Sequence, residues 1–177
     1  IDAHAYASAG ISTDHECTMP EEALDKIDAG MRIIIREGSA AKNYNALHTL
    51  IGSHPDMVML CSDDKHPDDL MRGHINQLVI RSLSFGYDLM DVLQIACVNP
   101  VRHYNLNVGL LQPGDPADMI LVQDLDSFNV MSTWIDGDNV FANGIINLPA
   151  VEIPVINSFG IDPIEPDELQ LHLKSAP

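Results

Sequence analysis

The sequence has few basic residues and few cysteines. Its 177 residues include 9 Lys and Arg against 26 Asp and Glu, so the net charge is −17. A protein that coats nucleic acid needs a positive surface for the phosphates, so this charge argues against that class. The three cysteines (Cys17, Cys61 and Cys97) have no CxxC spacing. Their odd number and low density argue against a disulfide scaffold and fit a reducing cytoplasm.

Long apolar runs and several common motifs are also missing. No run approaches the roughly 18 residues that a bilayer-spanning helix needs, and no signal-peptide pattern opens the chain. The absence of Walker, GxGxxG, GxSxG and HExxH motifs leaves glycine-rich phosphate loops, serine hydrolases and zincins without support. The chain starts in mid-pattern with Ile1 in place of Met, so we expect a piece of a longer protein.

The first two-thirds of the chain alternates short apolar runs with helical patterns, at intervals of roughly 20 to 25 residues. The runs cover residues 11–13, 33–35 and 57–61. Strands that are continuously apolar are typical of a parallel sheet covered on both faces. The pattern therefore predicts an α/β fold with a parallel sheet or a (β/α)8 barrel.

Polar residues at the helix starts predict where the helices begin. Thr18 and Glu21 have the spacing of a capping box, and Ser39 can cap the next helix. We expect a further helix over residues 69–86, and Asp88 as the cap of the helix after it.

The amino-acid composition changes after about residue 108, where glycine and proline become frequent. Apolar runs at 119–122, 130–135 and 140–142, with a turn at 136–139, predict antiparallel strands. Prolines interrupt the chain from residue 149 onward. We therefore divide the chain into barrel units (1–107), a β-rich segment (108–148) and a proline-rich tail or lead-in to another domain (149–177).

Each apolar run of the α/β part ends in ionisable side chains. These clusters are Asp14-His15-Glu16, Arg36-Glu37 and Asp63-Asp64-Lys65-His66. Ligands of α/β proteins bind at the carboxyl ends of the strands. Charged groups there cost desolvation energy unless they are paired or bind a metal. The sequence therefore predicts a functional site at this edge of the sheet.

Single residues in these clusters allow more than one interpretation. His15 suits a divalent transition metal, but taken alone a histidine in this position is more often a solvated loop residue. Asp63 is a candidate metal ligand, proton shuttle or helix cap. His66 faces either a substrate or the solvent from a surface turn.

Three stretches together carry a family resemblance: AGISTDHEC at 9–17, IREGSAAKN at 35–43, and SDDKHPDDL at 62–70 followed by GHI at 73–75. They resemble the bacterial adenine deaminases of the amidohydrolase superfamily. The later PGDPAD at 113–118 fits the exit of that superfamily from its barrel into a small β domain. The resemblance extends from about residue 1 to residue 148.

The resemblance implies a (β/α)8 barrel whose sixth, seventh and eighth strands are the three apolar runs. It implies hydrolysis of adenine to hypoxanthine and ammonia at a divalent metal centre, with Mn²⁺ first and Fe²⁺ or Zn²⁺ as alternatives, and no organic cofactor. The metal would acidify a water molecule, which attacks C6 of the purine.

The same resemblance assigns roles to six residues. His15 would be a metal ligand, and Asp63 would be both a metal ligand and the catalytic proton carrier. Four residues would bind substrate: Glu37 and Ser39 at the rim, and Asp64 and His66 at the mouth.

The resemblance also implies ligands that this chain does not contain. The family's HxH pair, bridging glutamate and HxPG histidine lie upstream, so we expect the chain alone to bind metal weakly or not at all and to be inactive. Its open sheet edges should pair with a second copy or with the missing N-terminal part. The alternatives are another metal hydrolase of the superfamily, acting on a cyclic amide or nucleobase, and a non-catalytic, self-associating fragment.

Overall fold

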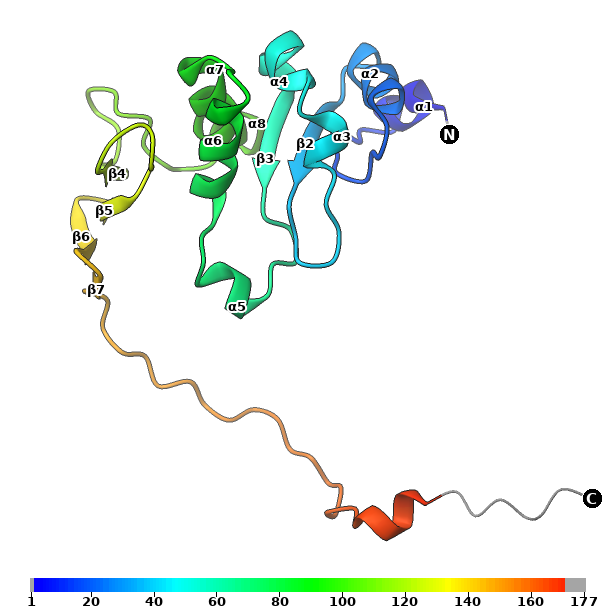
Figure 1. Cartoon of the computed structure of the whole chain (residues 1–177), viewed down its shortest axis with the longest axis vertical. Helices are drawn as coiled ribbons and strands as arrows, with labels where there is room; N and C mark the ends of the chain where they lie inside the picture. The colour runs from blue at the N-terminus through cyan, green and yellow to red at the C-terminus, as the bar shows by residue number, and fades with distance from the viewer. Residues whose placement is uncertain (1, 171–177) are drawn as a thin grey trace, which may run out of the picture.

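A three-stranded parallel sheet forms the centre of the molecule in the computed structural model, which describes residues 2–170. The strands β1 (Thr13–Asp14), β2 (Arg32–Arg36) and β3 (Val58–Cys61) lie in the order β1-β2-β3. Figure 1 shows β2 and β3 side by side. Both neighbouring pairs are parallel, with Ile33 opposite Asp14 on one side and Val58 on the other. The predicted parallel α/β arrangement is confirmed.

Helical segments precede and connect these strands and then follow β3. They are α1 (Ala3–Ser8), α2 (Pro20–Asp28), α3 (Tyr44–Leu47), α4 (Leu50–Ser53), the 3₁₀ turn η1 (Pro55–Met57), α5 (Pro67–Leu70), α6 (Ile75–Ser84), α7 (Leu89–Leu93), the π-helical segment η2 (Gln94–Val98) and α8 (Asn99–Tyr104). Parallel strands need such crossovers because each strand must return to the same end of the sheet.

The side chains of β2 alternate between two environments. Ile33 and Ile35 are fully buried, whereas Arg32, Ile34 and Arg36 are half-buried. The prediction that continuously apolar strands are covered on both faces is therefore wrong for β2, although it fits Val58–Leu60 of β3. Successive side chains of a strand point to opposite faces, and the described elements cover only one face of β2 completely.

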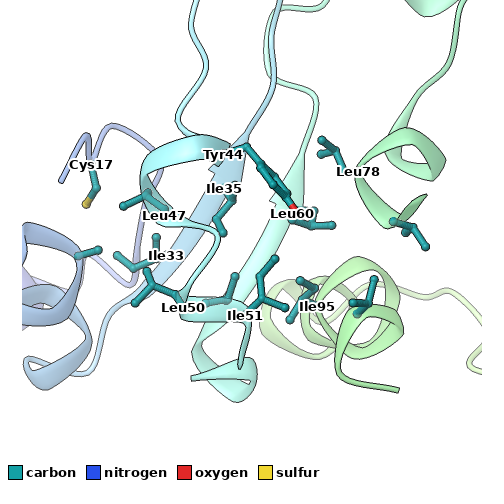
Figure 2. Close-up of a cluster of buried hydrophobic side chains, with 14 of the residues drawn as sticks. Cys17, Ile33, Ile35, Tyr44, Leu47, Leu50, Ile51, Leu60, Leu78 and Ile95 are labelled. Carbon is teal, nitrogen blue, oxygen red and sulfur yellow. The ribbon is translucent and has the colours of Figure 1, made fainter. Parts of the chain in front are cut away.

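The hydrophobic core joins this covered face to the helices, and Figure 2 shows its labelled side chains converging from the two strands and the segments around them. Tyr44 is the largest fully buried side chain. Its hydroxyl lies 2.8 Å from the Ser82 Oγ, and the Arg81 guanidinium lies 4.1 Å from the centre of its ring. Both contacts tie α3 to α6, which is the second helix after β3.

Two of the four predicted helix starts are wrong. The N-cap residue of α2 is Met19, not Thr18, and it makes no side-chain capping hydrogen bond. The Thr18 N–H donates to the Glu22 carboxylate, so the predicted capping box of Thr18 and Glu21 does not form. The helix after β2 begins at Tyr44, so Ser39 does not cap it.

The other two predictions meet different outcomes. The helix expected over residues 69–86 is divided into α5 and α6, with Gly73 between them at a φ of +152°. Asp88 does cap α7, since its carboxylate accepts hydrogen bonds from the N–H groups of Met90 and Asp91. This last prediction is confirmed.

A second sheet follows, built from antiparallel strands in chain order. Its strands are β4 (Met119–Val122), β5 (Val130–Ile135), β6 (Asp138–Ala142) and β7 (Ile145–Ile146). The predicted antiparallel arrangement is confirmed, but β6 starts two residues earlier than expected and β7 was not expected. Asp136 and Gly137 both have positive φ, at +50° and +87°. That geometry is typical of a tight two-residue hairpin turn.

Beyond this sheet, residues 149–170 are exposed and contain one regular element, η3 (Pro166–Leu169). The last part of the predicted tail, residues 171–177, lies outside the described residues. The three-part domain division remains a prediction. Among the helices that the structure describes, none is both long and apolar enough to cross a membrane.

Candidate active site

The three loops that carry the ionisable clusters leave the sheet at one edge. In Figure 1 the loops that follow β2 and β3 extend from the same end of these strands, with α5 at the tip of the β3 loop. Since all three strands are parallel, the loop after β1 also starts from this edge. The sequence-based prediction that the three clusters share one edge is therefore met by the topology.

Arg36 joins the outer two loops. It is the last residue of the central strand, and its side chain is only 12% exposed. Its Nη1 donates to Asp63 Oδ2 at 2.7 Å, and its Nη2 donates to Glu16 Oε2 at 2.6 Å. Burial opposes the charge of the guanidinium, but the two carboxylates outweigh it and raise the pKa of Arg36. The result is a cationic bridge between the ends of β1 and β3.

Asp63 is held in an uncommon backbone conformation. Its φ is +50°, in the left-handed region that Asp and Asn tolerate better than most residues. Its carbonyl accepts a hydrogen bond from the Lys65 N–H at 2.8 Å. Arg36 occupies Oδ2, while Oδ1 accepts no hydrogen bond from residues 2–170. One carboxylate oxygen is thus anchored and the other is available to a ligand.

His15 lies in the loop after β1, next to Glu16. Its ring is about half exposed, and its Nε2 lies 3.4 Å from Glu16 Oε1. Glu16 is the same residue whose other carboxylate oxygen accepts the hydrogen bond from Arg36. A continuous network therefore runs from His15 through Glu16 and Arg36 to Asp63.

The buried side chain of Asn43 fixes the backbone beneath this network. Its Nδ2 donates to the carbonyls of His15 and Cys17 at 3.1 and 3.0 Å. Its Oδ1 accepts a hydrogen bond from the Arg36 N–H at 2.8 Å. Asn43 therefore ties the His15 loop to the end of β2, a role that no sequence pattern indicated.

Replacing Asn43 by Ala is expected to lower the free energy of unfolding by about 1–3 kcal/mol, because buried backbone groups lose their partners. Urea denaturation of the chain measures this change. Asn107→Ala, at an exposed position, is the matched control and should change the free energy by less than about 0.5 kcal/mol. Equal effects of the two variants would show that the Asn43 hydrogen bonds do not stabilise the loop.

A second polar cluster holds the far side of the β1 loop. Lys26 Nζ lies 3.0 Å from Asp14 Oδ2, 2.8 Å from Glu22 Oε1 and 3.4 Å from Cys17 Sγ. Burial, together with the neighbouring Asp14 carboxylate, raises the pKa of Cys17 to about 12. The thiol is therefore protonated at neutral pH, as expected of a cysteine that is not a nucleophile.

Glu37 and Ser39, which were expected to bind substrate, contact the α5 and α6 side of the edge. Glu37 Oε2 lies 3.1 Å from Arg81 Nη1, and its Oε1 accepts from the Tyr44 N–H. Ser39 donates to Asp69 Oδ2 at 2.6 Å and accepts from the His66 N–H at 2.8 Å. These contacts organise the neighbouring loops.

Asp64 and His66 are exposed in the loop after β3. Asp64 packs against Gly38, where an added Cβ would lie 2.6 Å from Asp64 Oδ1. His66 occupies the N-cap position of α5 without a side-chain capping bond. The structure therefore places His15 and Asp63 in one network and the other four residues beside it. Their roles remain predictions.

The donor chemistry fits part of a metal centre. An imidazole nitrogen and a carboxylate oxygen are ligands that Mn²⁺, Fe²⁺ and Zn²⁺ accept. Over residues 2–170, however, no three His, Cys, Asp or Glu side chains come together as a candidate metal site. His15 and Asp63 have the donor chemistry of metal ligands, and their metal-binding role remains a prediction.

The amidohydrolase family profile matches residues 2–140, which is most of the chain. The chain belongs to the amidohydrolase family. A solved β-aspartyl dipeptidase from Fervidobacterium islandicum AW-1 aligns with a TM-score of 0.61 and 26% identity over 75% of this chain and 37% of that protein. The amidohydrolase chain described here is thus a partial (β/α)8 barrel with a small antiparallel sheet, as predicted.

Individual relatives are closer in sequence. The chain is 52% identical over 170 residues to an adenine deaminase of Salinibacter ruber and 50% identical over 171 residues to one of Methanosarcina mazei. Each alignment covers 96% of this chain but 31% of the relative. The amidohydrolase chain therefore spans about a third of the length of these relatives, and the predicted resemblance to adenine deaminases is confirmed.

Proposed function

We propose that this chain is part of an adenine deaminase, which hydrolyses adenine with one water molecule to hypoxanthine and ammonia. The observation that carries the proposal is the identity of 50% or more to adenine deaminases over nearly the whole chain, all the strand-end loops included. The network from His15 to Asp63 supports it, because it places a metal donor and a proton carrier at the carboxyl edge of the sheet.

In this proposal, His15 and Asp63 contribute two donors to a divalent metal centre, with Mn²⁺ as the preferred ion and no organic cofactor. When bound, such an ion acidifies water and so supplies a nucleophile at neutral pH. The remaining ligands come from the rest of the whole protein.

Asp63 moves the proton in the proposed reaction. Arg36 anchors Oδ2, so that the unbonded Oδ1 is oriented to accept a proton from the attacking water and then to deliver it to the departing amino group. Arg36 itself remains a fixed cation, since its two carboxylate partners raise its pKa. Its role is to position Asp63 relative to His15.

The four neighbouring residues would shape the entrance for the purine. Asp64 and His66 are exposed at the mouth, where their side chains are free to approach the ring. Glu37 and Ser39 would act at the rim by holding the loops in place. The odd number and low density of its cysteines fit a cytoplasmic protein. We expect this chain to pair with a second copy or with the N-terminal part of the same protein.

The test is ammonia release by the whole protein with added Mn²⁺. We expect one ammonia and one hypoxanthine per adenine consumed, and no ammonia from this chain alone. A β-aspartyl dipeptide is the comparison substrate, because a dipeptidase shares the fold. If the whole protein binds metal but leaves adenine unchanged, the amidohydrolase assignment stands and adenine is excluded as the substrate.

A further inference from the structure

A pocket separate from His15 and Asp63 opens between the loop after β2 and the start of α6. Its volume is about 410 Å³, within the range of small-molecule sites. Its polar side chains come from the loop after β2, from the segment between β3 and α6, and from α6 itself. They are Glu37, Lys42, Lys65, Asp69, Arg72, Gln77 and Arg81. Neither His15 nor Asp63 lines it.

The pocket is positively charged in a strongly acidic protein. Four of the nine Lys and Arg residues of the whole chain line it, against two carboxylates. Those carboxylates are matched by the arginines, since Arg72 lies 2.9 Å from Asp69 and Arg81 lies 3.1 Å from Glu37. Lys42 and Lys65 form no ion pair with any side chain in residues 2–170, so the charged side chains that line the pocket sum to +2, with the Asp64 carboxylate nearby against Gly38.

The neighbouring groups respond to this charge. A hydrogen bond from Ser39 lowers the pKa of Asp69, and the charges of Arg72, Lys42 and Lys65 lower it further. Burial lowers the pKa of His74, and the charge of Lys65 adds to that effect. The hydrogen bond and burial are the larger causes of these two shifts, and the lysine charges add to both.

We propose that this pocket binds the phosphate group of a small molecule through Lys42 and Lys65. Lysine binds phosphate as a compact positive charge, and the two free ammonium groups can neutralise a doubly charged phosphate. In (β/α)8 barrels, phosphates are frequently held by the loops after the last two strands. The resemblance matches β2 and β3 to those strands. The pocket has room for more than the phosphate alone, so a phosphate monoester is the favoured source.

Isothermal titration of the whole protein tests the proposal with three probes: adenosine 5′-monophosphate, inorganic phosphate and uncharged adenosine. We expect the monophosphate to bind and adenosine not to compete with it. Lys42→Gln and Lys65→Gln should each raise the dissociation constant about tenfold, because each removes a charge-assisted contact. Arg102→Gln, an exposed cation outside the pocket, is the matched control and should leave binding unchanged.

The outcomes separate the possible sources of the phosphate. Inorganic phosphate that binds as tightly as the monophosphate, with the same dependence on both lysines, supports the site with the free anion as its ligand. Affinity that is unchanged in both lysine variants overturns the proposal, as does equal binding of adenosine. Both lysine side chains are at least partly exposed, so the variants should fold normally. Unchanged thermal unfolding without ligand checks this. Ammonia release from adenine is measured separately, because Glu37 lines this pocket and also belongs to the proposed rim of the purine entrance.

Discussion

Asp63→Asn in the whole protein is expected to reduce kcat for ammonia release from adenine by about 10²- to 10⁴-fold, the usual contribution of a positioned general acid–base. Asn cannot accept and return a proton, but its amide oxygen can still accept the Arg36 hydrogen bond that Asp63 accepts at 2.7 Å. It also tolerates the positive φ at this position, so the backbone of the loop should persist. Steady-state kinetics with adenine measure the change.

The control for this substitution is Asp25→Asn on the exposed surface of α2. It makes the same chemical change away from the edge that carries the strand-end loops, and kcat should stay within about twofold of the parent. Metal content is measured in both variants, so that a lost proton carrier can be distinguished from a lost ligand. A kcat for Asp63→Asn close to that of the control would remove Asp63 from the proposed proton transfer.

His15→Ala is expected to weaken metal binding by more than about tenfold, because even the loss of a group that hydrogen-bonds to a metal ligand costs about 10- to 100-fold. Ala removes the imidazole nitrogen but leaves the backbone carbonyl that accepts the hydrogen bond from Asn43. The loop should therefore keep its position while the donor is lost. Metal content after dialysis against a defined Mn²⁺ concentration reports the binding directly, and activity should fall with it.

His54→Ala provides the matched comparison. His54 is a partly exposed histidine beside η1, where its Nδ1 contacts only the neighbouring Ser53 hydroxyl among the hydrogen bonds of residues 2–170. Its loss should leave both metal content and activity within about twofold. If His15→Ala retained its metal as His54→Ala does, His15 would be a loop residue, the alternative that the sequence left open.

The sequence by itself determined the architecture and the edge of the sheet at which the ionisable clusters gather. Apolar runs that alternate with helical patterns predicted the parallel sheet, and the structure confirms it. Ionisable residues at the ends of these runs predicted one functional edge, because parallel strands end on the same side. These properties depend on local periodicity and on strand direction, and both can be read along the chain. The same holds for the cap at Asp88, where donor and acceptor lie two or three residues apart.

The pairing of the polar side chains was decided by the tertiary structure. Arg36 and Asp63 are 27 positions apart in the sequence. Asn43 and His15 are 28 positions apart. Nothing in a local pattern distinguishes Arg36, which bridges the site, from the adjacent Glu37, which turns to Arg81. Ser39 has the spacing of a helix cap, yet its hydroxyl bonds Asp69 from another loop. The preference of a side chain for a local hydrogen bond is weak compared with the cost of leaving a buried polar group unpaired. The orientation of each polar side chain is therefore decided by the hydrogen-bond partners that the neighbouring loops supply.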